Sequence, residues 1–298
     1  MEEMKEKGMG KIGILLVIVI IITIVGTGFT LVFAEKETLK ISGSTTVRPL
    51  ARKWRNEFMK ENPNIRISVK GGGSGQGVSD VKGGLSNIGM SSSKTLVTKE
   101  NDLVLHLMAY DAILLIVNEK NPILNILKEN GIKQSTLQKI YSGKTTNWKD
   151  IPGIERNQTL FNYKRSDKSG TGEVFAGFLR MTQGELEGIG VHGNLGIKEA
   201  IISNKWGIGF VGAKYAFDNS IEVIPLDGNN DGEITDYERI ENFNDLTSDI
   251  ENYPIQRGLY FATKGEPTGM TGTFMEWCKN EGQSYISEIG YVPITGSR

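Results

Sequence analysis

The chain has 298 residues, and its 34 lysines and arginines nearly balance its 35 aspartates and glutamates. A formal net charge of -1 at pH 7 provides no basic surface of the kind that nucleic-acid-binding proteins use, so nucleic acid is not an expected partner. The single cysteine, Cys278, excludes an internal disulfide. The two histidines, His106 and His192, have no metal-ligand spacing and support no Ser-His-Asp arrangement.

The N-terminal part of the chain has the composition of a membrane segment. Residues 12–33 contain no charged residue, and about 20 apolar residues suffice to cross a bilayer as a helix. The span is preceded by lysines, which favour the cytoplasm: Lys5, Lys7 and Lys11. We therefore expect a cytoplasmic segment at 1–11, a transmembrane anchor at 12–33 and an extracytoplasmic body. A signal segment cleaved after Ala34, which would release the body, is the alternative.

From Thr38 onward, short apolar runs alternate with amphipathic stretches, the pattern of an α/β protein with largely parallel sheets. Strands are expected at 38–44, 65–71, 87–93, 112–118, 159–165, 206–212, 221–226 and 257–263. Helices are expected near 47–58, 135–141, 172–182, 195–204 and 271–280. Because about 260 residues exceed what one hydrophobic core usually holds, the body should divide into two lobes.

Three loops between predicted strands and helices are rich in glycine, serine and threonine: "SGSTTV" (42–47), "GGGSGQG" (71–77) and "KSGTGE" (168–173). Free backbone N–H groups and the positive end of a helix dipole favour an anion at such junctions. None of the loops has the spacing of a nucleotide-binding motif. Each alone could be a plain turn or a helix cap. The three together, with Arg165 four residues before Ser169, predict a site for a free oxyanion.

Five motifs taken together are more specific than any one of them: "ISGSTTVRPLARKW", "GGGSGQGV", "IGMSSS", "YSGKTTNWKDI" and "RSDKSGTGEVF". In this order they closely resemble the phosphate-binding subunit of Pst-type ABC importers. The resemblance implies a type II-like periplasmic-binding-protein fold, in which two α/β lobes close on phosphate. The lobes implied are 38–116 with 255–298, and 117–225, with 226–254 connecting them. It also implies a monomer without catalytic activity that delivers phosphate to ABC permease subunits.

The same resemblance, taken motif by motif, implies which residues hold phosphate: Ser44, Thr45, Thr46, Ser74, Arg165, Ser169, Gly170 and Thr171. Ser92 stands where some family members have an aspartate that accepts the proton of hydrogen phosphate. Some acceptor is still expected, since a site made only of donors would not favour HPO₄²⁻ over sulfate. We predict Asp111 in this role; Asp167 is the rival, and Asp111 as a simple strand-edge residue is the alternative.

A separate motif, "DGNNDGEITDYE", matches the calcium-loop pattern D-x-[DN]-x-[DN]-G-x5-E over residues 227–238. The expected calcium ligands are the side chains of Asp227, Asn229, Asp231 and Glu238 and the backbone carbonyl of Glu233. Thr235 would add a hydroxyl or a water. An acidic surface turn is the alternative. Bound calcium would be structural, because the loop lies outside the three anion-binding motifs.

The sequence thus predicts an extracytoplasmic phosphate-binding protein at the cell membrane. Two other functions remain open at this stage. A phosphate-ester hydrolase could use the same cleft, although the sequence shows no nucleophile paired with a base. A calcium-dependent surface protein for sensing or adhesion would need only the loop at 227–238.

Overall fold

The computed structural model describes residues 38–294. The predicted cytoplasmic segment 1–11, the predicted anchor 12–33 and the alternative cleavage site at Ala34 lie outside the described residues. None of the helices within 38–294 combines the length and the hydropathy needed to cross a bilayer.

The strands are β1 (Thr38–Gly43), β2 (Arg66–Gly71), β3 (Ile88–Ser91), β4 (Leu103–Asn118), β5 (Ile132–Lys133), β6 (Phe161–Arg165), β7 (Ile189–Val191), β8 (Gly207–Gly212), β9 (Ile221–Ile224), β10 (Leu226–Asp227) and β11 (Gln256–Lys264). The α-helices are α2 (Arg48–Glu61), α3 (Ser74–Lys82), α4 (Lys94–Thr98), α5 (Leu124–Asn130), α6 (Gln134–Tyr141), α7 (Gly170–Phe178), α8 (Gly193–Ser203), α9 (Phe243–Asp249) and α10 (Gly269–Lys279). Single turns of 3₁₀ helix lie at Trp148–Asp150, Gln183–Glu185, Ala213–Tyr215, Glu281–Tyr285 and Ser287–Ile289.

The main sheet is mixed, whereas the sequence predicted largely parallel sheets. Its strand order is β2-β1-β3-β11-β4-β8-β6-β7, and β9 also pairs with β4. Pairs at both ends of the sheet are parallel: β1 with β2 and β3, and β6 with β7 and β8. Pairs in the middle, which involve β4 and β11, are antiparallel. The prediction missed this because β4 carries the chain out of the first lobe and β11 brings it back.

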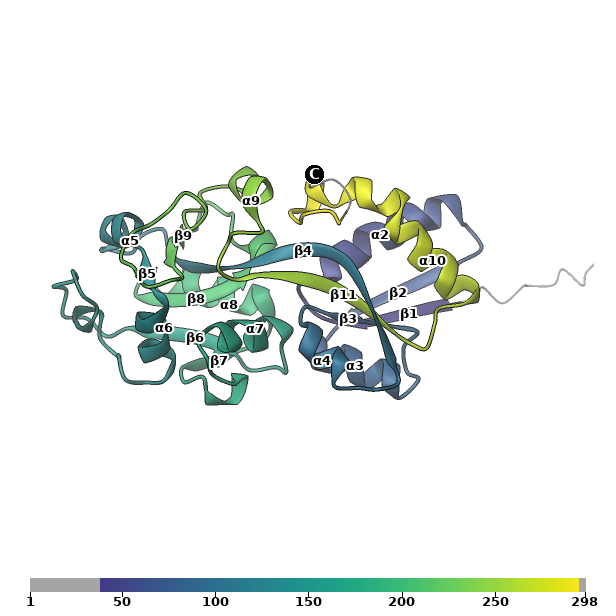
Figure 1. Cartoon of the computed structure of the whole chain (residues 1–298), viewed down its shortest axis with the longest axis horizontal. Coiled ribbons are helices and arrows are strands. Elements are labelled where there is room, and N and C mark those ends of the chain that lie inside the picture. Colours follow the sequence, from purple (N-terminus) through teal and green to yellow (C-terminus); the bar gives the residue numbers. More distant parts are fainter. Residues whose placement is uncertain (1–37, 295–298) are drawn as a thin grey trace, which may run out of the picture. The chain divides into compact units, whose positions relative to one another are not determined.

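β4 and β11 run side by side between the two lobes (Figure 1). β4 is 16 residues long, longer than the strand expected at 112–118. Its first part, 103–111, contains both half-buried and buried side chains, and its second part, 112–118, is buried throughout. The long apolar run therefore marked only the part of β4 that enters the second lobe.

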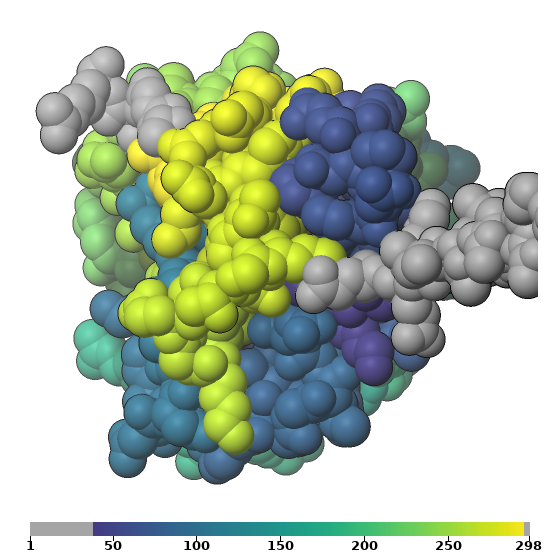
Figure 2. All heavy atoms as spheres, turned by 90° about the vertical axis from the view of Figure 1, so that its right-hand side faces the viewer, coloured from purple at the N-terminus to yellow at the C-terminus, as the bar shows by residue number. Residues whose placement is uncertain are grey.

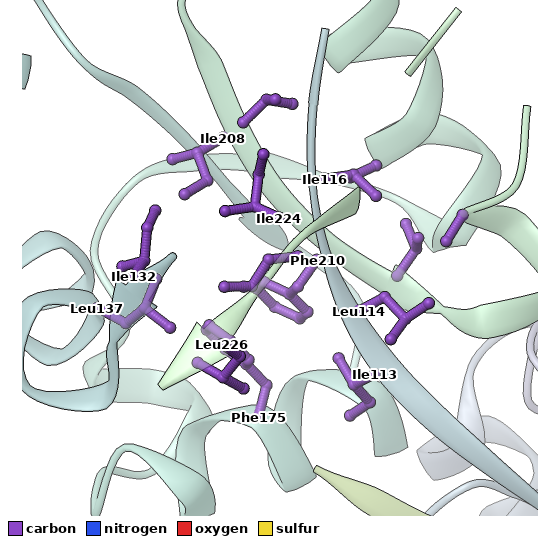
Figure 3. Close-up of a cluster of buried hydrophobic side chains, with 14 of the residues drawn as sticks. Ile113, Leu114, Ile116, Ile132, Leu137, Phe175, Ile208, Phe210, Ile224 and Leu226 are labelled. Atoms are coloured by element: carbon purple, nitrogen blue, oxygen red, sulfur yellow. The ribbon is translucent and has the colours of Figure 1, made fainter. Parts of the chain in front are cut away.

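Each lobe has its own hydrophobic core. In the first, Trp54 of α2 meets Phe261 of β11 edge-on, with ring centroids 5.7 Å apart. α10 lies beside α2 on the outer face of this lobe, as Figure 2 shows in yellow and dark blue. In the second, Phe175 of α7 stacks on Phe210 of β8 at 3.9 Å (Figure 3).

The two cores meet part-way along β4 and β11. On β4 the change falls between Ala109 and Ala112, a few residues before the boundary predicted at 116. The segment 226–254, predicted as a connection, contributes α9 and packs Leu246 and Ile250 into the second core. β4 and β11 therefore pass from the first core to the second at neighbouring positions.

Candidate functional site

The first hydroxyl-rich loop joins β1 to α2. Gly43 ends β1 with φ 128°, and a Cβ there would lie 2.4 Å from the carbonyl oxygen of Met90. Only glycine lets the chain turn this close to β3. The hydroxyl residues that follow are buried: Ser44, Thr45 and Thr46. Because buried hydroxyls need partners, these side chains must be bonded within the site.

The second loop adds a cluster of serine hydroxyls. Gly73 precedes α3 with φ 94° and gives its first turn no side-chain cap. Ser74 Oγ lies 3.3 Å from Ser92 Oγ, which in turn accepts a hydrogen bond of 3.1 Å from Ser44 Oγ. The ends of β1, β2 and β3 thus place three hydroxyls together at the N-terminus of α3.

The third loop brings the second lobe against these hydroxyls. Ser169 caps α7 by accepting a 3.1 Å hydrogen bond from Gly172 N. A Cβ on Gly170 would lie 2.6 Å from the Oγ atoms of both Ser74 and Ser92. Thr171 Oγ1 lies 3.0 Å from Thr46 Oγ1. The N-terminus of α7 therefore faces the serine cluster of the first lobe at close range.

Arg165, the last residue of β6, supplies the cation of the site. Its Nε and Nη2 atoms donate to the two oxygens of Asp167 at 2.8 and 2.5 Å. Nη2 also donates to Thr45 Oγ1 of the first lobe at 3.2 Å. The remaining nitrogen, Nη1, is buried and has no hydrogen-bond partner within residues 38–294. A fixed cation with a free donor is what an oxyanion requires.

The electrostatics of the pair keep Asp167 ionised. Burial lowers the pKa of Arg165, although Asp167 counteracts the change, and an arginine remains protonated in proteins. Burial also raises the pKa of Asp167, but bonds from Arg165 and from Gly193 N, at 3.2 Å, outweigh it. The pKa of this carboxyl therefore lies below its ordinary value.

Asp111, the predicted acceptor of the ligand's proton, is paired with a second arginine. Arg257 of β11 donates to its Oδ2 from Nε at 3.0 Å and from Nη2 at 2.6 Å. Ala213 N donates to Oδ1 at 3.1 Å. The carboxylate thus accepts two bonds at Oδ2 and one at Oδ1. It positions Arg257, whose Nη1 donates to Thr171 Oγ1 at 2.9 Å.

Sequence reasoning missed Arg257 as well as Asn194. Asn194, at the start of α8, is fully buried and donates to Thr46 Oγ1 at 2.8 Å. The sequence does contain a signal for each. Arg257 directly precedes the apolar run 258–262 of β11, and a buried charge needs a partner such as Asp111. Asn194 follows a glycine at another junction between a strand and a helix.

A pocket of about 300 Å³ opens beside these residues. It is lined by Thr45, Arg48, Gly71, Gly72, His192, Gly193, Asn194, Leu195 and Tyr215. Tyr215 donates to the carbonyl of Thr45 at 2.8 Å, and burial raises the pKa of its phenol to about 12. It therefore remains a neutral donor at physiological pH. Thr45 is the buried hydroxyl residue of the three loops that lines this pocket.

The structure thus brings the predicted residues of the three loops, together with Ser92, into one polar cluster: Ser44, Thr45, Thr46, Ser74, Arg165, Ser169, Gly170 and Thr171. Asp111 lies behind the cluster. The other histidine, His106, bonds Thr263 in the first lobe instead and takes no part in the cluster.

The predicted calcium loop lies in the second lobe. Asp227 and Glu238 are buried, whereas Asn229, Asp231 and Glu233 are exposed. In the part of the chain that the structure describes, no group of three or more His, Cys, Asp or Glu side chains is gathered tightly enough to hold a metal ion. The acidic side chains of the loop bond to its own N–H and hydroxyl groups instead.

Comparison with known proteins gives a consistent result. A model of the PBP superfamily domain matches residues 33–281. The phosphate-binding protein PstS of Bacillus subtilis is 32% identical over 263 residues, which cover 87% of this chain and 81% of that protein. PstS of Borreliella burgdorferi is 27% identical over 275 residues, 87% of this chain and 91% of that protein.

Solved structures agree with the sequence relatives. One is described as a phosphate ABC transporter substrate-binding protein of Clostridium perfringens with bound phosphate. It has a TM-score of 0.72 and 26% identity, covering 87% of this chain and all 100% of that one. A phosphate transport receptor of Vibrio cholerae, with a TM-score of 0.64 and 23% identity over 85% of this chain and 99% of that one, shares the fold. The chain therefore belongs to the PBP superfamily and, within it, to the PstS family of phosphate-binding proteins.

Proposed function

We propose that the chain binds inorganic phosphate where the three loops meet and delivers it to an ABC permease. The observation that carries the proposal is the buried, unpartnered Nη1 of Arg165, for which no acceptor lies within residues 38–294. Leaving a charged donor unsatisfied inside a protein is costly. A phosphate oxygen at this point would accept from Nη1 and remove that cost.

The surroundings favour a small, multiply charged oxyanion. Hydroxyls of both lobes and the N-termini of α3 and α7 provide donors on several sides. Two carboxylates beside these donors, Asp111 and Asp167, are each bonded to an arginine. An anion would therefore be held by donors without facing a free negative charge. Binding rather than catalysis is the role this arrangement supports.

The position of the protein in the cell follows from the same proposal. The body works on the extracytoplasmic side, where a permease partner collects the ligand. We propose that residues 12–33, which carry no charge, keep the body at the cell membrane. Each copy contains both lobes of the site, so a monomer is sufficient for binding.

The direct test is calorimetric titration of the full chain, in detergent micelles, with inorganic phosphate and with sulfate. We expect one phosphate per chain and weaker binding of sulfate. No heat with phosphate at any concentration up to the millimolar range would overturn the proposal. Turnover of a chromogenic phosphate ester would instead favour a hydrolase.

A further inference from the structure

The loop from Asp227 to Glu238 has no part in the proposed phosphate site. It joins β10 to the segment that leads to α9. Its twelve residues contain five acidic and no basic side chains, and they match the calcium-loop pattern at every specified position. An acidic loop alone does not make a metal site, so the positions of the oxygen atoms within the loop are the relevant observation.

Main-chain N–H groups fix one oxygen of each side chain in the first half of the loop. Asp227 Oδ2 accepts from Gly232 N at 2.9 Å, Asn229 Oδ1 from Asp231 N at 3.0 Å, and Asp231 Oδ1 from Glu233 N at 2.8 Å. Gly232 makes the sharp turn with φ 91°. The turn thus holds the side chains of alternate residues in place, as an oxygen-ligand site requires.

The second oxygen of Asp227 is the observation that points to a cation. Asp227 is 1% exposed, and its Oδ1 is buried without a hydrogen-bond donor from any described residue. The nearest cation, Lys133 Nζ, lies 3.8 Å from the other oxygen, and its side chain is 45% exposed. A buried carboxylate oxygen without a donor is unfavourable. A metal ion inside the loop would satisfy it.

We propose that this loop binds Ca²⁺ as a structural ion. Asp227 Oδ1, the side chains of Asn229 and Asp231, the backbone carbonyl of Glu233 and the carboxylate of Glu238 are the ligands. Oxygen ligands of this number and irregular arrangement suit calcium, whereas Mg²⁺ requires stricter octahedral geometry and loses water reluctantly.

Binding requires the loop to tighten, because its carboxylates are not gathered closely enough to hold a metal ion in the described residues. Asp231 Oδ2 accepts from Asn229 Nδ2 at 2.7 Å, and this bond and those of Glu238 have to change. Glu238 Oε2 now accepts from Thr235 N at 3.1 Å and from Thr235 Oγ1 at 2.8 Å, while Oε1 accepts from Gly228 N at 2.8 Å. These bonds hold the carboxylate against the loop, 2% exposed. Exchanging the Thr235 bonds for the metal ion lets Glu238 close the site without leaving the interior.

Calorimetric titration of the full chain with CaCl₂, in phosphate-free buffer, tests the proposal. We expect one calcium per chain with a dissociation constant of about 10⁻⁴ to 10⁻³ M, the range of extracellular modules. This range rests on the extracytoplasmic location proposed above, whereas the existence of the calcium site does not. Glu238→Gln should weaken calcium binding at least about tenfold, because it removes the bidentate carboxylate. Mg²⁺ should bind more weakly than Ca²⁺.

Asp236→Asn is the matched control, because Asp236 is exposed in the same loop and carries the same charge but is not a proposed ligand. It should leave calcium affinity within about twofold, since an exposed charge is screened by salt. If Glu238→Gln does not fold, the exposed Asp231→Ala replaces it with the same expected loss. Absence of calcium binding by the natural chain, or equal weakening by Asp236→Asn, would overturn the site while leaving the phosphate proposal intact.

Discussion

At the scale of single residues, the site depends on arginines that carboxylates hold in place. Arg165 is oriented by Asp167, and Arg257 is oriented by Asp111. The two arginines differ in the partner of their Nη1 atom. Nη1 of Arg257 donates to Thr171, whereas Nη1 of Arg165 is buried without a partner in residues 38–294. Arg165 is therefore the residue that would bind the ligand directly.

We expect Arg165→Ala to weaken phosphate binding by roughly 2 kcal/mol or more, about thirtyfold. The loss reflects removal of a buried charge-assisted donor. Calorimetry of the full chain measures it, and Arg156→Ala, at an exposed position outside the loops, is the control that should bind normally. An unchanged affinity in Arg165→Ala would remove this residue from the site.

Asp111→Asn should weaken phosphate and sulfate by the same factor. The change removes the charge that holds Arg257, and a misplaced Arg257 should affect both anions alike. The measurement is the ratio of the two dissociation constants, taken on protein that melts cooperatively. A selective loss of phosphate would show that Asp111 reads the proton, as the sequence first suggested, and Asp167→Asn gives the corresponding test of Asp167.

At the scale of elements, the N-terminus of α7 reaches the first lobe because its first residue is a glycine. Gly170→Ala would place a methyl group 2.6 Å from the Ser74 and Ser92 hydroxyls, so the two lobes could not approach fully. We expect phosphate affinity to fall more than about tenfold, since the ligand would lose donors from one side. Alanine suits a helix better than glycine, so the melting temperature without phosphate should not fall by more than a few degrees.

Gly177→Ala, in the same helix, provides the control for this prediction. A Cβ at Gly177 meets no atom within 4 Å, so phosphate should bind as it does to the natural chain. Comparable losses in both variants would mean that α7 responds to a general change in helix stability. The close contact at Gly170 would then have no special role.

The elements also show how much of the site could be predicted from the sequence. The three loops were predictable because glycine and hydroxyl residues at a strand-to-helix junction are a local pattern. The partnership of Arg257 with Asp111 was not, because these residues are 146 positions apart and meet only through the register of β11 on β4. For the same reason, the charge of Asp111 was visible in the sequence, but its partner was not.

At the scale of the whole described body, β4 and β11 are the strands that join the two cores (Figure 1). A β-bulge interrupts their pairing between Leu259 and Tyr260, close to Arg257. The mixed sheet could not be predicted from apolar runs, because pairing direction depends on the path of the chain between lobes. This linkage is suited to a hinge, since a few residues absorb the rotation.

Phosphate should therefore make the molecule more compact. We expect the radius of gyration from small-angle X-ray scattering to decrease on adding phosphate, because donors of both lobes converge on one anion. Sulfate at the same concentration should have a smaller effect. Gly170→Ala should not reach the compact state at any phosphate concentration. An identical scattering profile with and without phosphate would show that the lobes do not move.

The two arginine–aspartate pairs also determine the electrical state of the loaded molecule. Because each of these two guanidinium groups is matched by a carboxylate, the two pairs together contribute no net charge. A bound anion therefore adds its full charge to a chain whose formal net charge is only -1 at pH 7. Loading should increase electrophoretic mobility toward the anode and lower the isoelectric point, so a partner could distinguish loaded from empty molecules by charge as well as by shape.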